Sequence, residues 1–209
     1  KEVRNYVQER MDLMFTTYAP PKDLEPRRDI RVGIPQCFSV YTMYPLYSWY
    51  FHALGIQTEL SSEVAHSGTA RVESTYCFPA EIAHGAVYNS WEKNPDYIFI
   101  PHYRDMPSYE EDVHANFCPI TQGLPYYIRQ AFTEIPRERI LSPVVSFKFG
   151  KEKAKSYFRD MASQLGISPE ESDAAFETAY AKQSSYFQAA ENLGKEALQE
   201  ARNKNQPVI

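Results

Sequence analysis

The sequence predicts an α/β fold with a parallel sheet, followed by a purely helical extension. Short alternating apolar runs are each followed by a helical pattern, and one strand, helix and strand fit within about 30 residues, the length of a βαβ unit. The composition also changes near residue 151, after which only helical patterns occur. We therefore predict an N-terminal helix and linker over residues 1–28, a Rossmann-like or flavodoxin-like lobe over 29–150, and a helical extension over 151–209.

The N-terminal segment has helical spacing over residues 2–18. Its apolar residues are Val3, Tyr6, Val7, Met11, Met14 and Phe15. Pro20 and Pro21 end this pattern and begin the linker, because proline lacks the N–H that a helix interior requires.

The first βαβ unit comprises a strand over residues 29–35, a loop over 36–44, a helix over 45–54 and a second strand over 56–60. Alternating isoleucine and valine mark the first strand. Pro45 suits the first turn of the predicted helix, where a backbone N–H has no partner in any case. Two strands joined by a helix imply a parallel sheet.

The next unit begins with a mainly polar stretch over residues 61–75 that has room for a short helix. A helix over 79–93 and a strand over 96–101 follow. Residues 102–117 are rich in His, Arg, Asp, Glu and Tyr, and they predict a long loop. Loops of this length in compact domains are uncommon and often functional.

The last part of the lobe is predicted to hold a helix over residues 119–132 and a fourth strand over 140–147. Pro125 is expected to kink or split this helix, with 126–132 as its second half. Pro143 is expected to place the strand at a sheet edge or at a bulge.

The extension is predicted to contain two helices and no strand. The first runs over residues 151–165 and ends at Gly166. The second begins at Ser168-Pro169, with a serine cap and proline in the first turn, and runs to about residue 203 with a possible interruption at Gly194. The extension is expected to pack on the lobe through Phe158, Phe176, Tyr180 and Phe187.

The overall composition excludes several classes of protein. A net charge of −5 and a pI near 5.6 argue against binding to nucleic acid. No apolar run approaches the roughly 18–20 residues that span a bilayer, so no membrane association is expected. Three cysteines do not form a disulfide framework, which favours a cytoplasmic location. Because the chain starts at Lys1, we expect it to be a piece of a longer protein.

All three cysteines lie on the approach to a predicted helix. Cys77 precedes Pro79 by two residues, Cys118 directly precedes Pro119, and Cys37 stands more loosely before the helix at Pro45. The partial positive charge of a helix N-terminus favours a thiolate. Ligands of open parallel sheets bind at the carboxyl ends of the strands, so the three thiols are expected at one edge.

Several chemistries remain open for these residues. Free cysteine is often a small buried apolar residue, so inert thiols are one interpretation. Structural zinc usually shows close Cys-x-x-Cys pairs, whereas these cysteines are 40 and 41 residues apart; thiolates from separate loops suit an iron–sulfur cluster at least as well. A Cys/His hydrolase is conceivable, but no pair is selected. The Gly-x-Gly-x-x-Gly pattern of dinucleotide sites is lacking, and so is a Gly-x-Ser-x-Gly elbow.

Three histidines are weighed beside the cysteines. His84 lies seven residues after Cys77 on the same predicted helix, as either a packed core residue or a group that hydrogen-bonds to a metal ligand. His102 follows a strand directly and is interpreted either as a loop histidine without a specific role or as a group that hydrogen-bonds to a metal ligand. His114 lies in the predicted long loop, where a specific role is less expected.

The order and spacing of seven short motifs resemble the acyl-CoA dehydratase activase-related domain, over roughly residues 28–150. The motifs are Arg31-Val32-Gly33-Ile34-Pro35, Tyr41, Tyr44-Pro45, Cys77-Phe78-Pro79-Ala80, His84-Gly85, Asp96-Tyr97-Ile98-Phe99-Ile100-Pro101 and Cys118-Pro119. This domain accompanies the ATPase activators of 2-hydroxyacyl-CoA dehydratases and is similar to the subunits of those dehydratases and of benzoyl-CoA reductase.

The resemblance implies a cytoplasmic module of anaerobic acyl-CoA metabolism that holds a 4Fe–4S cluster between two lobes and transfers electrons. Cys77 and Cys118 match cysteines of the pattern. Cys37 and Gln36 depart from it, standing where an aliphatic or small residue and an arginine are expected, so a ligand role for Cys37 is doubtful. The implied partners are an ATPase activator domain, in the same or an associated protein, and an acyl-CoA dehydratase. A second lobe would supply further ligands, so the isolated chain is expected to hold no cluster.

Two other functions remain as alternatives. The chain could be one lobe of an acyl-CoA dehydratase-like or reductase-like enzyme that binds the CoA thioester directly. An apolar cleft formed by the predicted loop over 102–117, with a cysteine at its floor, would favour this alternative. It could instead be a structural interaction domain whose cysteines are inert, which buried and mutually distant thiols would favour.

Overall fold

The sheet at the centre of the computed structural model is parallel and has four strands. The structure describes residues 4–21, 26–72, 77–106 and 115–205. The strands are β1 (Arg31–Ile34), β2 (Gln57–Leu60), β3 (Tyr97–Phe99) and β5 (Ile140–Leu141), in the order β2-β1-β3-β5. Taken in chain order, this is the 2-1-3-4 arrangement of flavodoxin-like folds. The predicted α/β fold is therefore confirmed, in its flavodoxin-like form.

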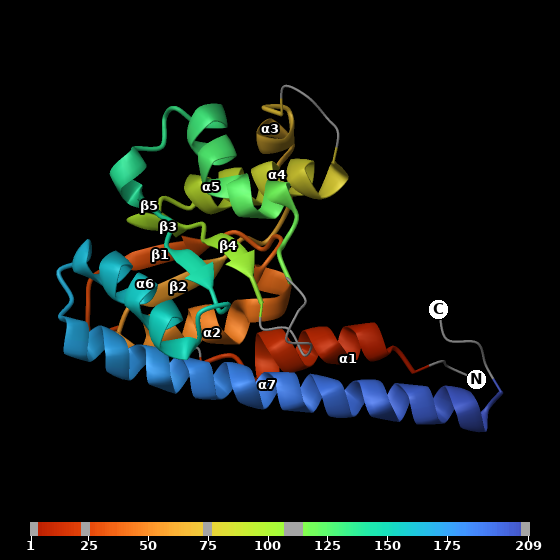
Figure 1. The fold of residues 1–209 in the computed structure, drawn as a ribbon. Coiled ribbons are helices and arrows are strands. Elements are labelled where there is room, and N and C mark those ends of the chain that lie inside the picture. Colours follow the sequence, from red (N-terminus) through yellow and green to blue (C-terminus); the bar gives the residue numbers. More distant parts are fainter. Residues whose placement is uncertain (1–3, 22–25, 73–76, 107–114, 206–209) are drawn as a thin grey trace.

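Helices cover both faces of the sheet (Figure 1). On one face lie α3 (His66–Thr69), α4 (Phe78–Glu92) and α5 (Pro119–Ala131). The opposite face carries α2 (Val40–Ala53), α6 (Lys151–Ser163) and α7 (Pro169–Asn203), with α1 (Tyr6–Asp12) and its π-helical continuation η1 (Leu13–Thr17) beyond α2. A 3₁₀ turn, η2 (Arg137–Arg139), leads into β5. None of the helices in the described ranges combines the length and apolar character needed to cross a bilayer.

Prolines separate two pairs of consecutive strands. The prediction of one strand over residues 140–147 is wrong, because Pro143 separates β5 from β6 (Val144–Ser146). Pro101 likewise separates β3 from β4 (His102–Asp105), and β4 and β6 form a second, parallel pair. The backbone N–H of His102 donates to the carbonyl of Pro143, so the β4–β6 pair comes directly after the β3–β5 pair.

The start of β4 also corrects the loop predicted over residues 102–117. Tyr103 and Asp105 are buried and alternate with the more exposed His102 and Arg104, as a strand requires. The Asp105 carboxylate accepts hydrogen bonds from the Ser146 hydroxyl and from two backbone N–H groups that follow it. Because Asp105 is polar, the hydropathy pattern does not show that this position is buried in a strand. Residues 107–114, with His114, lie outside the described residues.

The helix predicted over residues 45–54 begins five residues earlier, at Val40, so Pro45 lies in its interior. Proline offers no N–H to the carbonyl four residues before it. That carbonyl belongs to Tyr41, and it accepts a hydrogen bond from Arg10 Nη1 at 3.2 Å. A group from another element thus replaces the missing intrahelical partner, and the helix continues through the proline.

The next turn of α2 is bridged by Gln183 of α7. The Leu46 N–H donates to Gln183 Oε1 at 3.0 Å, and Gln183 Nε2 donates to the Thr42 carbonyl at 2.9 Å. These are the two backbone groups that an uninterrupted helix would join directly. Gln183 is only 2 % exposed, so its amide satisfies both groups away from water.

The other helices follow the sequence more closely. The helix α5 is continuous through Pro125, so the predicted split does not occur. The helix α7 is continuous through Gly194, and the Ser168 hydroxyl accepts from the Glu171 N–H at its start, as predicted. Phe158 and Phe176 are buried in the core, as predicted. Phe187 is 37 % exposed and lines a small cavity with Met43 and Tyr103 of the lobe.

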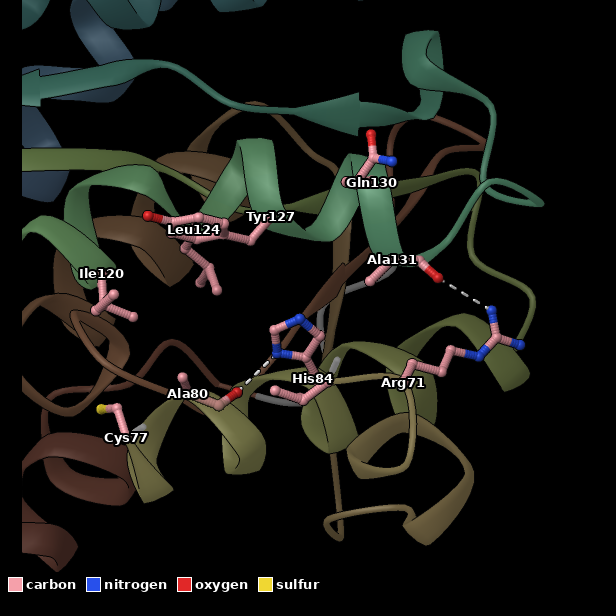
Figure 2. A pocket seen from close by; sticks show the side chains of 10 residues that line it. Arg71, Cys77, Ala80, His84, Ile120, Leu124, Tyr127, Gln130 and Ala131 are labelled. Carbon is pink, nitrogen blue, oxygen red and sulfur yellow. Dashed lines mark hydrogen bonds between the residues drawn. The ribbon is translucent and has the colours of Figure 1, made fainter. Parts of the chain in front are cut away.

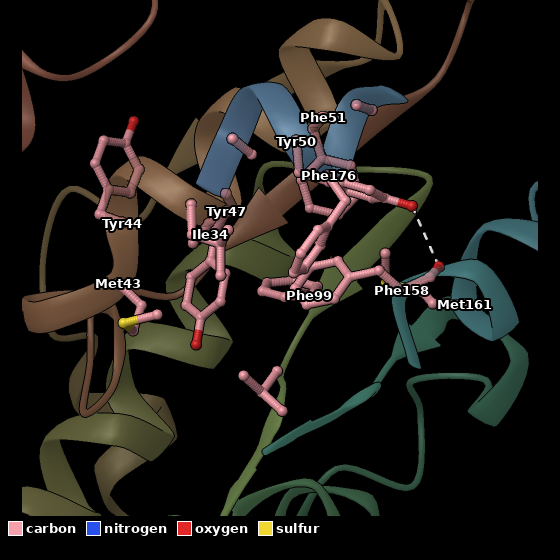
Figure 3. Packing of buried hydrophobic residues seen from close by; sticks show 14 of the residues in the cluster. Ile34, Met43, Tyr44, Tyr47, Tyr50, Phe51, Phe99, Phe158, Met161 and Phe176 are labelled. Carbon is pink, nitrogen blue, oxygen red and sulfur yellow. Dashed lines mark hydrogen bonds between the residues drawn. The ribbon is translucent and has the colours of Figure 1, made fainter. Parts of the chain in front are cut away.

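The core between the sheet and α2, α6 and α7 is built from aromatic rings that meet edge to face (Figure 3). Tyr47 and Phe51 of α2 each contact Phe99 of β3, with ring centroids 4.9 and 5.3 Å apart. Tyr50 contacts Phe158 of α6 at 4.9 Å, and its hydroxyl hydrogen-bonds to Ser172 of α7 at 2.7 Å. The lobe and the helices after residue 150 therefore share one core.

Replacing Gln183 with leucine is expected to lower the free energy of unfolding by about 2–4 kcal/mol, because the Leu46 N–H and the Thr42 carbonyl lose their buried partner. Urea unfolding measures this change. The matched control is Gln188→Leu on the same helix, where the exposed side chain bonds only to Asn192 and the expected change is within about 0.5 kcal/mol. Equal effects of the two substitutions would contradict the role of the Gln183 amide.

Candidate functional site

Two cysteines cap neighbouring helices at the carboxyl edge of the sheet. Cys77 is the N-cap of α4 and Cys118 is the N-cap of α5. Because α4 leads into β3 and α5 leads into β5, and these strands are parallel, both helices start at the same edge. Their placement at helix starts on one edge is as predicted, while their role as ligands stays a prediction.

Cys118 is held in a setting that favours its thiolate. The Thr121 hydroxyl lies 3.3 Å from Cys118 Sγ, and the Thr121 backbone N–H donates to the same sulfur at 3.4 Å. The bond to the Thr121 side chain, with the backbone N–H groups of Thr121 and Ile120, lowers the pKa of the Cys118 thiol below its usual value. The side chain is also exposed, so this thiol is accessible to reagents and metals.

Cys77 lies at one end of a cavity of about 180 Å³ between α4 and α5 (Figure 2). Its side chain is half-buried. Ile120, two residues after Cys118, lines the same cavity, which brings the starts of the two helices to a common space. The cavity is open to solvent on one side and mostly apolar inside. Its remaining lining residues are Arg71, Val72, Ala80, His84, Leu124, Tyr127, Gln130 and Ala131.

One wall of the cavity depends on two glycines. A side chain at Gly68 of α3 would lie 2.5 Å from the His84 carbonyl, and one at Gly85 of α4 would lie 2.5 Å from Val64. The two helices therefore pack at a distance that only glycine permits. This contact fixes the segment after α3, which carries Arg71 and Val72 into the wall. Arg71 and Val72 were not predicted as site residues, because their place in the wall depends on this packing.

His84 projects from α4 into the cavity. Its Nδ1 lies 2.7 Å from the Ala80 carbonyl on the same helix, and the ring is 6 % exposed. It is seven residues from Cys77, or about 10 Å along the helix, which is too far for the Cys/His pair of a hydrolase. His84 therefore belongs to the apolar cavity, and a contact with a metal ligand stays a prediction.

The other predicted site residues lie apart from this cavity. Cys37 is 5 % exposed, packed among apolar side chains, and burial raises the pKa of its thiol to about 12. A thiol with so high a pKa stays protonated, which favours an apolar role over a ligand role. His102 lies in β4 with its ring edge-on to Tyr126, and burial, with the nearby Arg104 charge, lowers its pKa.

The described residues contain no group of three or more His, Cys, Asp or Glu side chains arranged to hold a metal ion. Cys77 and Cys118 remain the predicted metal-binding pair. Cys37 follows β1 at the same edge, as predicted, but it is buried in an apolar cluster. A complete ligand set would need side chains from outside the described part of the chain.

The fold and this edge together define a class: a flavodoxin-like α/β protein with two cysteine-capped helices beside an apolar cavity. Residues 31–209 match the family model described as CoA enzyme activase uncharacterised domain (DUF2229), and the chain belongs to this family. This match confirms the resemblance to the acyl-CoA dehydratase activase-related domain and identifies the chain as a CoA enzyme activase module. Comparisons with curated proteins and with solved structures found no match.

Replacing Thr121 with valine is expected to raise the pKa of the Cys118 thiol, because the thiolate loses its hydroxyl donor. The rate of Cys118 alkylation at neutral pH should fall, and the midpoint of its pH dependence should move upward. Mass spectrometry of the Cys118 peptide measures both. Thr178→Val on the exposed face of α7 is the control and should leave the profile in place. An unchanged midpoint in Thr121→Val would contradict the assigned hydrogen bonds.

Alanine at Gly68 and at Gly194 should have opposite effects. At Gly68 the new methyl group meets backbone, so we expect a loss of about 1–3 kcal/mol in the free energy of unfolding. At Gly194 no atom lies within 4 Å, so alanine should stabilise the helix by about 0.5–1 kcal/mol. Urea unfolding compares the two, and a stabilised Gly68→Ala variant would show that α3 does not pack this closely.

Proposed function

We propose that this activase module contributes two thiolates, from Cys77 and Cys118, to a 4Fe–4S cluster that transfers electrons to an acyl-CoA dehydratase. The observation that carries the proposal is that both cysteines cap neighbouring helices at one edge of the sheet. Iron–sulfur clusters are held by thiolates, often drawn from segments far apart in the sequence. A helix N-terminus also favours the negative charge of a thiolate-bound cluster.

The residues present fit part of such a site. Cys118 accepts hydrogen bonds that favour its thiolate, and hydrogen bonds to cluster sulfurs are one means by which proteins tune cluster potentials. Cys77 is half-buried and faces the shared cavity. Two thiolates are half of a four-cysteine set, so the proposal requires further ligands from another lobe or chain. For this reason we expect no stable cluster on this chain alone.

When bound, the cluster would supply one-electron transfer. The protein's own residues would hold the cluster at the edge of the sheet and leave its outer side open to a partner. The exposed apolar residue Phe78 lies directly after Cys77. The proposed partners are an ATPase activator domain and the dehydratase, and the proposed location is the cytoplasm, where a reducing environment keeps the thiols free.

The test uses the protein expressed from its complete gene and purified without oxygen. Iron analysis and thiolate-to-iron charge-transfer absorbance should both report a cluster. Cys77→Ser and Cys118→Ser should each lose most of the iron, whereas Cys37→Ser, which changes a buried thiol outside the pair, should keep it. If the wild-type protein carries no iron, the proposal is wrong, and a structural module with inert cysteines takes its place.

A further inference from the structure

We propose that the cavity between α4 and α5 is a binding site for a small, uncharged aromatic molecule that carries one hydroxyl group, of which phenol is the simplest. The hydroxyl donates a hydrogen bond to His84 Nε2, and the ring occupies the apolar space between the helices (Figure 2). This site adjoins the proposed cluster at Cys77, but the binding of the small molecule does not depend on the cluster.

The size and lining of the cavity suit a single aromatic ring. Its volume is about 180 Å³, and an apolar cavity of about 150 Å³ binds benzene. Ile120 and Leu124 of α5 face Ala80 of α4 across it, with Ala131 at the far end (Figure 2). Apolar walls with one or few well-placed polar groups are the usual character of small-molecule sites.

His84 supplies the polar group of the site. Because a carbonyl oxygen can only accept, the contact of Nδ1 with the Ala80 carbonyl places the proton on Nδ1 of the neutral ring. Nε2 is then an acceptor, and it points from α4 toward α5 (Figure 2). Among the residues that the structure describes, none forms a hydrogen bond with Nε2. The His84 side chain is 6 % exposed and lines the open cavity, so Nε2 offers an acceptor to a ligand that can donate a hydrogen bond.

The charges around the cavity favour an uncharged ligand over a carboxylate. The Arg71 guanidinium already forms an ion pair with Glu134, donates to the Ala131 carbonyl, and lies over the rings of Tyr88 and Phe132. Its charge is therefore satisfied. Gln130 also contributes to the lining, but its amide points away from the space between the helices (Figure 2).

Titration of phenol and toluene into the intact protein tests the site. Isothermal titration calorimetry should give saturable binding of one molecule of either compound. In protein labelled with ¹⁵N-histidine, phenol should move the Nε2 resonance of His84, whereas toluene, which has no donor, should leave it near its free position. The absence of saturable binding, or equal shifts with both compounds, overturns the proposal.

Two variants locate the binding and its hydrogen bond. His84→Phe keeps an aromatic ring but removes the acceptor. Phenol should therefore bind at least about five-fold more weakly, and the affinity for toluene should change less than about two-fold. Ala131→Leu fills part of the cavity and should weaken the binding of both compounds at least about ten-fold. Ala181→Leu, at an exposed position of α7, is the matched control and should change the affinity for neither compound. If His84→Phe leaves phenol binding intact, or Ala131→Leu leaves both intact, the compounds bind elsewhere and the proposal fails.

Discussion

The pairing of the Gln183 amide with the backbone of α2 is the interaction on which the arrangement of this protein depends. Pro45 leaves α2 unable to complete its own hydrogen bonds, and buried backbone groups without partners are costly. Arg10 and Gln183 supply the missing partners, so α1 and α7 are held to the same helix. The Gln183 amide hydrogen-bonds to both backbone groups of the interrupted turn, and this pairing fixes the position of α7 along α2.

The consequence for the core is that the lobe is completed by helices that follow it in the sequence. Tyr50 reaches Phe158 of α6 and Ser172 of α7, and Phe158 packs against Phe176. One face of the sheet is therefore covered by α2 together with the extension. The family match runs through the same helices to residue 209, in agreement with their packing on the lobe.

The opposite face is organised by a different constraint, the close contact between Gly68 and α4. This contact brings Arg71 to one end of a cavity whose other end is bounded by Cys77. The carboxyl edge of the sheet thus offers two distinct environments. An exposed thiol favoured as thiolate lies at Cys118, and an apolar space with a histidine acceptor lies behind it. We propose the first for a metal and the second for a small organic molecule.

Local sequence patterns were enough to predict the parallel α/β fold, the starts of α4, α5 and α7, and the placement of Cys77 and Cys118 at helix N-termini. Proline, serine caps and alternation act over a few residues, so they are readable locally. Four other features became visible in the folded protein: α2 continues through Pro45, Asp105 lies in a strand, Cys37 is buried, and His84 faces a cavity with Arg71. Each of these features depends on hydrogen bonds or packing between segments far apart in the chain. A local sequence pattern does not indicate which distant segments will meet.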